Sequence, residues 1–177
     1  SSVCICGFKE EANATIVQGV DLDLVEVGSA AMIDDEIFRV DAINAAAGTA
    51  VLARGCVDTL PAPHEAGALI WFYEDWTAED TREYVTGETV QVKLLSRTSS
   101  ATLAENLAPV DSLRMNQRQA RPYAPGRVLV CGVAYPTKTY GVLTVSWAHR
   151  NRLLQADQLV DSSASSISLE AGTTYTL

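Results

Sequence analysis

Two histidines, His64 and His149, are the residues best suited to proton transfer in this sequence of 177 residues, because a neutral imidazole is the usual general base near pH 7. His64 follows the tripeptide Pro-Ala-Pro at residues 61–63 and precedes Glu65, and Asp58 lies six positions before it. Either carboxylate could orient it as a base. No Gly-x-Ser-x-Gly elbow or metal motif accompanies it, however, so a loop histidine that fixes the turn before residues 68–73 is the favoured interpretation.

Carboxylates and aromatic rings gather between residues 71 and 80, where glycoside chemistry is conceivable. A glycosidase holds two carboxyl groups several ångströms apart across the sugar. An acidic loop that follows a buried strand is the commoner meaning of such a segment. A sugar-binding surface needs exposed rings but no tuned pKa, and Tyr73 and Trp76 are the candidates for it. The residues concerned are Trp71, Tyr73, Glu74, Asp75, Trp76, Glu79 and Asp80.

Arginines cluster at two places and are candidates for an interface between subunits or domains. In the predicted strand 141–147, Leu143, Val145 and Trp147 share one face, and His149 continues that face beyond the strand. Arginine pairs bidentately with carboxylates, and the chain is rich in acid. The candidate interface residues are His149, Arg150 and Arg152 after this strand, and Arg114, Arg118 and Arg121 further upstream.

Charge excludes several classes of partner. The chain has 22 acidic and 13 basic residues, a net charge of −9, whereas nucleic acids and anionic membranes attract concentrated positive charge. No apolar run is long enough for a membrane-spanning helix, and no export signal is evident at the N-terminus. A protein or carbohydrate partner fits better, and we expect neither nucleic-acid binding nor a membrane span.

The four cysteines predict neither a disulfide framework nor a metal site. Cys4 and Cys6 are separated by one residue, which is too close for an ordinary metal knuckle. Cys56 and Cys131 each lie alone in apolar sequence and are expected to be buried, reduced thiols. We therefore expect no metal or cofactor and a reducing compartment.

The hydrophobic pattern predicts a mainly β protein. Apolar and polar residues alternate in several segments, and turn residues separate the strands expected between about 30 and 56. The run 68–73 is apolar throughout, which suits a strand covered on both faces. Residues 79–84 and 101–115 carry only weak helical patterns. The predicted strands lie within residues 21–27, 36–43, 68–73, 88–95, 127–136 and 141–147, and the Ser-rich patch 161–168 is expected to be a loop.

A domain boundary is predicted at residues 114–126, which combine three arginines with two prolines and a glycine. We expect a β-rich domain of antiparallel barrel or sandwich type over residues 1–113, a stiff linker over 114–126, and a partial sandwich over 127–177. The last part is about half as long as an immunoglobulin-like sandwich, and its final residues, TTYTL, read as a strand. We therefore expect a longer parent chain or partner subunits to complete it.

Two regions resemble proteins of long-tailed bacteriophages. The segments PGRVLVCGVAYP, GVLTVSWAHRNRLLQ and LEAGTTYTL look like the start of the fibronectin type III-like domain of phage tail proteins. Upstream, MIDDEIFRVDAI and LARGCVDTLPAPHEAGALIWF are similar to the β-rich region of the tail-tip or baseplate hub proteins of these phages and of gene transfer agents. The resemblance covers roughly residues 20–75 and 115–177 and includes no catalytic signature.

This resemblance implies a structural protein of the virion, located at the tail tip and assembled in the cytoplasm of the host bacterium. Its expected partners are other baseplate proteins, copies of itself and a host receptor or glycan, in an oligomeric assembly that serves tail assembly and host attachment. It implies no cofactor and no catalytic residue, and we expect no enzyme activity. A carbohydrate-binding module for cell-surface recognition is the alternative, and a cell-wall or capsule hydrolase is the weaker one.

Overall fold

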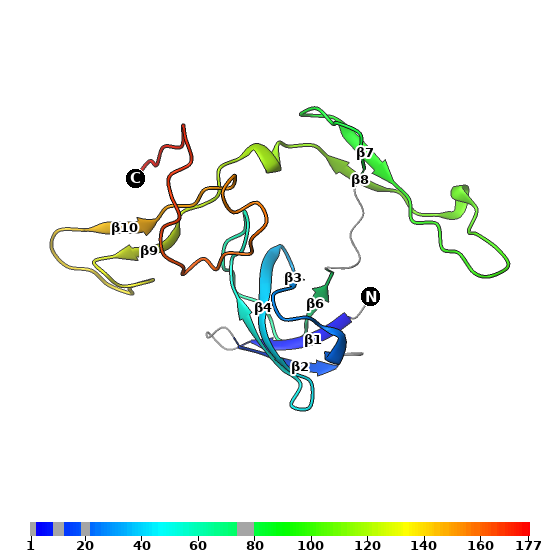
Figure 1. Cartoon of the computed structure of the whole chain (residues 1–177), viewed down its shortest axis with the longest axis horizontal. Helices are drawn as coiled ribbons and strands as arrows, with labels where there is room; N and C mark the ends of the chain where they lie inside the picture. Colours follow the sequence, from blue (N-terminus) through cyan, green and yellow to red (C-terminus); the bar gives the residue numbers. More distant parts are fainter. Residues whose placement is uncertain (1–2, 9–12, 19–21, 74–79) are drawn as a thin grey trace. The chain divides into compact units, whose positions relative to one another are not determined.

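The computed structural model confirms a mainly β chain built from antiparallel strands (Figure 1). It describes residues 3–8, 13–18, 22–73 and 80–177, the first two ranges as backbone only. The strands are β1 (Val3–Phe8), β2 (Asn13–Gln18), β3 (Ala30–Ile33), β4 (Glu36–Asn44), β5 (Thr49–Ala53), β6 (Ala68–Phe72), β7 (Thr89–Val92), β8 (Asp111–Arg114), β9 (Gly126–Val130) and β10 (Val145–Ala148). Three short 3₁₀ helices are η1 (Leu22–Leu24), η3 (Glu105–Leu107) and η4 (Arg118–Ala120).

The first six strands form a closed barrel in the order β1-β2-β5-β4-β3-β6. Two-residue turns suit antiparallel neighbours, and Asp34 and Asp35 make the turn between β3 and β4, with Asp34 at a φ of 50°. The ladder closes where β1 pairs with β6, with Val3 opposite Trp71 and Cys6 opposite Ala68. Closure leaves the barrel without a free strand edge.

The core of the barrel comes from alternate residues of its strands. Inward positions recur every second residue, as at Phe38 and Val40 of β4 and at Ala50 and Leu52 of β5. The fully or almost fully buried set is Ala31, Ile33, Phe38, Val40, Ala50, Leu52 and Ile70. Their burial supplies the hydrophobic stabilisation of this part of the chain.

The C-terminal segment belongs to the same compact unit as the barrel, which comprises residues 1–78 and 122–177. In it β9 and β10 pair as a two-stranded antiparallel sheet, with Val145 opposite Val130. The strand expected in TTYTL is not formed, because residues 173–177 make no ladder. The segment is held to the barrel instead by backbone contacts, such as the 2.8 Å bond from the amide of Ser162 to the carbonyl of Arg54.

Residues 79–121 form a second compact unit. Here β7 and β8 pair as a two-stranded ribbon, with Val90 opposite Leu113 and Thr89 opposite Arg114. The strand predicted in 88–95 is confirmed over β7. The domain boundary predicted at 114–126 stays a prediction; Arg114 ends β8, η4 lies inside that range, and Gly126 begins β9.

Two further local expectations were wrong. Residues 22–24 form η1 rather than a strand. The strand 68–72 is not covered on both faces, since Leu69 and Trp71 are exposed while Ile70 is buried. No helix of the described residues is long and apolar enough to cross a membrane.

Candidate functional site

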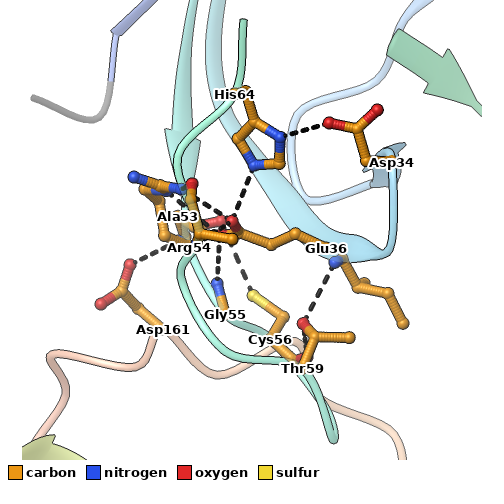
Figure 2. Close-up of polar contacts among 11 residues, drawn as sticks. Asp34, Glu36, Ala53, Arg54, Gly55, Cys56, Thr59, His64 and Asp161 are labelled. Atoms are coloured by element: carbon orange, nitrogen blue, oxygen red, sulfur yellow. Dashed lines mark hydrogen bonds and ion pairs between the residues drawn. The ribbon is translucent and has the colours of Figure 1, made fainter. Parts of the chain in front are cut away.

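The densest group of charged side chains surrounds Glu36, the first residue of β4 (Figure 2). Its side chain is 1% exposed and stands in phase with the inward residues Phe38 and Val40, so the strand points a carboxylate toward the barrel interior. Such burial is costly unless the charge is paired and hydrogen-bonded. Arg54, which follows β5 directly, supplies the pairing through Nε at 3.1 Å and Nη2 at 2.7 Å.

Backbone amides complete the surroundings of this carboxylate. The amide of Gly55 donates to Oε1 of Glu36 at 2.9 Å, and the amide of Ala62 donates to Oε2 at 2.9 Å. Arg54 in turn donates from Nη2 to the carbonyl of Ala62 at 2.5 Å. The loop after β5 is thus attached to the start of β4 by charge-assisted hydrogen bonds, which are the stronger class.

His64 lies between two carboxylates. Its side chain is 2% exposed, with Nε2 2.8 Å from Oε2 of Glu36 and Nδ1 2.8 Å from Oδ2 of Asp34 (Figure 2). Only the imidazolium form can donate to both, because a neutral ring carries a single N–H. In that form the positive charges of His64 and Arg54 balance the two carboxylates.

The two carboxylates hydrogen-bonded to the ring of His64 come from β4 and from the β3–β4 turn, whereas the sequence had offered Glu65 or Asp58 as carboxylates that could orient it. His64 is a loop histidine that fixes its turn by hydrogen bonds, as expected. Its partners lie 28 and 30 residues away in the sequence.

A half-buried carboxylate from the C-terminal segment approaches the other side of Arg54. Oδ2 of Asp161 accepts from the amide of Arg54 at 2.8 Å, and Oδ1 accepts from the amide of Ser163 at 2.6 Å. Burial alone would raise the pKa of Asp161. Hydrogen bonds from Ser163 and from the Arg54 amide, together with the charge of Arg39, outweigh that effect and hold its pKa below the usual range.

Cys56 carries a nucleophilic thiol close to this group of side chains, but its surroundings oppose reaction. It is buried, as predicted, and its Sγ lies 3.7 Å from the carbonyl of Ala53. Burial in apolar surroundings raises the pKa of its thiol to about 12, so very little thiolate forms near pH 7. Thr59 is also occupied, since its hydroxyl donates to the carbonyl of Cys56 at 2.8 Å and accepts from the amide of Ile37 at 3.1 Å.

This ionic cluster, formed by Asp34, Glu36, Arg54 and His64, is suited to holding loops on the barrel. It brings together the β3–β4 turn, the end of β5 and the loop before β6, and Asp161 adds the C-terminal segment. Among the residues that the structure describes, no group of three His, Cys, Asp or Glu side chains has an arrangement that could hold a metal ion.

Arg150, predicted at an interface, lies inside the C-terminal segment and is 5% exposed. Its guanidinium donates to five carbonyls within the chain, from 3.0 to 3.1 Å. Desolvation by burial lowers its pKa, which the charge of Asp161 partly opposes. The carbonyls belong to His149, Asp161, Ser162, Ala164 and Ser165. In this conformation Arg150 organises the 161–165 loop rather than offering a free charge to a partner.

The neighbours of Arg150 also have partners within the chain. Arg152 donates from Nε to Oε1 of Glu170 at 2.8 Å and from its amide to Oε2 at 3.0 Å. His149 places Nδ1 3.3 Å from the hydroxyl of Tyr175, whose ring also packs against Trp147 at 5.2 Å. Their interface role stays a prediction.

The remaining predicted site residues are not brought together. Arg114, Arg118 and Arg121 are exposed in the unit 79–121, and Arg121 donates to the carbonyl of Asn116 at 2.8 Å. Tyr73 is half-buried. Trp76, with Glu74, Asp75 and Glu79, lies outside the described residues, so the glycan site proposed on these aromatics stays a prediction.

Two expectations on single residues differ from the structure. Cys131 is exposed rather than buried, because it stands in the turn after β9 with a φ of 52°. Glu36 was not singled out from the sequence, although one signal for it was available. It shares the inward phase of Phe38 and Val40, and a charged residue in that phase predicts a buried ion pair.

Comparison with known proteins adds no identification: no protein-family model matches the chain, and no curated protein matches it.

Proposed function

We propose that this chain is a structural component of a bacteriophage tail tip or baseplate, acting in tail assembly and host attachment. The observation that supports an assembly role best is the apolar surface of the unit 79–121. The specific assignment to a phage rests on the resemblance of residues 20–75 and 115–177 to tail-hub and tail fibronectin type III-like sequences. The assembly role and the phage assignment are both consistent with a mainly β chain.

The unit 79–121 has little core of its own. Among its described residues Ala108 is the single buried apolar side chain, while the ribbon β7–β8 and its connections expose many large ones. A two-stranded ribbon is marginally stable alone in water. Its exposed apolar residues are Val85, Val92, Leu94, Leu95, Leu107, Val110 and Leu113. Surfaces of this kind mark contacts with other proteins.

In the proposed tail tip, neighbouring copies of this chain and other baseplate proteins would cover the exposed apolar residues of the unit 79–121.

The test combines native mass spectrometry with electron microscopy of virions from the source. We expect the chain to occur within a large symmetric particle, and a gold-labelled antibody against it to mark one end of the tail. A free 19 kDa monomer that is absent from purified virions would contradict the proposal.

A matched pair of variants tests the surface that supports it. Leu113→Ser in β8 should reduce incorporation into the particle without lowering the melting temperature, because Leu113 is exposed in the isolated chain. Leu153→Ser, an equally exposed leucine in the other unit, is the control and should assemble normally. Equal incorporation of both variants would show that the ribbon is not an assembly contact.

A further inference from the structure

A cavity of about 400 Å³ lies in the C-terminal segment, between the sheet β9–β10 and residues 165–166. This volume falls within the range of about 300–1,000 Å³ that is typical of small-molecule sites. Arg127 and Leu129 of β9, Ser146 and Trp147 of β10, and the hydroxyl-bearing Ser165 and Ser166 line it. None of these residues belongs to the ionic cluster or was a predicted site residue.

The polar groups around the cavity are mainly donors. Arg127 is exposed, and its guanidinium makes no ion pair with any residue that the structure describes. Ser166 accepts a bond from the amide of His149 at 3.1 Å, which leaves its own O–H to donate. The indole N–H of Trp147 is buried and has no partner within the described part of the chain.

The cavity wall is held in place before any ligand arrives. Four of the five bonds of Arg150 fix the carbonyls of Asp161, Ser162, Ala164 and Ser165. The amide of Ile167 donates to the carbonyl of His149 at 3.1 Å. Arg127 donates from its amide to the carbonyl of Ser162 at 2.7 Å. A site whose wall is already ordered loses less conformational entropy when it binds a ligand.

We propose that this cavity binds an acidic sugar, meaning a sugar ring that carries a carboxylate. Arg127 receives the carboxylate, because a guanidinium pairs with it through two parallel hydrogen bonds. The three serine hydroxyls meet ring hydroxyls, and the apolar wall of Trp147 and Leu129 lies beside the C–H groups of the ring.

The residues that line the cavity also indicate which ligands should bind less tightly. No carboxylate or amide side chain lines the cavity, and its one charged lining residue is Arg127, so a neutral sugar would leave that guanidinium without a counter-charge. A simple anion such as acetate would use Arg127 but would leave the serines and the apolar wall without partners. The carboxylate and the ring together therefore distinguish the proposed ligand.

The proposal is tested by titrating the intact chain separately with D-glucuronate, D-glucose and acetate. Binding is measured by calorimetry and NMR. We expect glucuronate to bind at least about tenfold more tightly than glucose, since one charge-assisted pair is worth about that factor. It should also bind more tightly than acetate, which lacks the ring that meets the serines and the apolar wall. Arg127→Gln should reduce glucuronate binding to the level of glucose. Arg97→Gln, which removes an exposed arginine from the other unit, should leave binding unchanged.

Three results would overturn the inference: no glucuronate binding, equal affinity for glucuronate and acetate, or equal loss in the two arginine variants. Circular dichroism of Arg127→Gln should match the parent chain, because the side chain of Arg127 is exposed. The outcome is independent of the tail-tip proposal. A monomer that bound glucuronate would keep this inference and contradict that one.

Discussion

The guanidinium of Arg150 fills the space beside Gly126 that the Cβ of any other residue would occupy. An alanine Cβ at position 126 would overlap Nη2 and Cζ of Arg150 and would lie 2.6 Å from the carbonyl oxygen of Ser162. The overlap involves a buried planar group with five bonds and a backbone atom, neither of which can move aside easily. Close approach, rather than a special backbone angle, explains the glycine at the start of β9.

Gly126→Ala should therefore destabilise the chain by roughly 3 kcal/mol, the upper part of the usual range for overpacking. Urea unfolding monitored by tryptophan fluorescence would measure it. Gly172→Ala is the control, because open space surrounds that glycine and only its left-handed backbone, at a φ of 81°, opposes a side chain. Its cost should be about 1 kcal/mol. Equal costs would contradict the packing argument.

Glu36→Gln should destabilise the barrel by about 3–5 kcal/mol, because it leaves Arg54 and His64 without their buried counter-charge. Asp34→Asn removes the other carboxylate on the same histidine, but Asp34 is 62% exposed and its loss should cost less than about 1 kcal/mol. Chemical denaturation of both variants gives the comparison. Similar losses of unfolding free energy in the two variants would mean that burial does not determine how much these ion pairs stabilise the chain.

Asp161 predicts a loss of stability in acid. Its pKa is lowered in the folded chain, so its contribution is fully present above the unfolded pKa of about 3.9 and is lost as pH falls through the folded value. Asp161→Asn should lower stability at pH 7 by about 1 kcal/mol and flatten the dependence between about pH 5 and 2. Asp157→Asn, which removes an exposed carboxylate nearby, is the control for the substitution itself and should change stability at pH 7 by less than about 0.5 kcal/mol. If the stability of Asp161→Asn depended on pH as steeply as that of the parent chain, this role of Asp161 would be contradicted.

The two thiols that the structure describes should differ in reactivity. Cys131 is exposed, whereas Cys56 is buried and its pKa is raised to about 12. Iodoacetamide at pH 8, followed by peptide mass mapping, should modify Cys131 within minutes and Cys56 only after denaturation. Cys131→Ser should abolish the fast reaction at that peptide. Rapid modification of native Cys56 would mean that the barrel end opens readily.

Strand β4 and the turns on either side of it were predictable, because apolar and polar residues alternate there with a period of two. In 36–43 the alternation gives β4, and in 30–56 the turns fall where Asp34 and Gly48 permit positive φ. The same alternation in residues 21–24 gave the wrong result, because so short a pattern does not determine whether neighbouring strands are present to pair with. Residues 22–24 form η1 instead.

The candidate site was less predictable, since its contacts join residues far apart in the sequence. The sequence identified His64 but assigned it carboxylates close in sequence, whereas folding brings Asp34 and Glu36 to its ring. The burial of Arg150 was also not predictable, because arginine is a common interface residue and nothing local indicates that four carbonyls of the 161–165 loop will accept its hydrogen bonds. The exposure of Cys131 follows from a turn that its apolar neighbours did not indicate.

The pairing of β1 with β6 sets the order in which the barrel can fold. Hairpins β3–β4 and β4–β5 join residues close in sequence, whereas Val3 meets Trp71 only after the intervening chain has been confined. Closing so long a loop has a large entropic cost that is recovered only when the ladder is complete, so it slows folding. The hairpins should therefore form early and closure late, and until then β6 presents an unpaired edge to neighbouring chains.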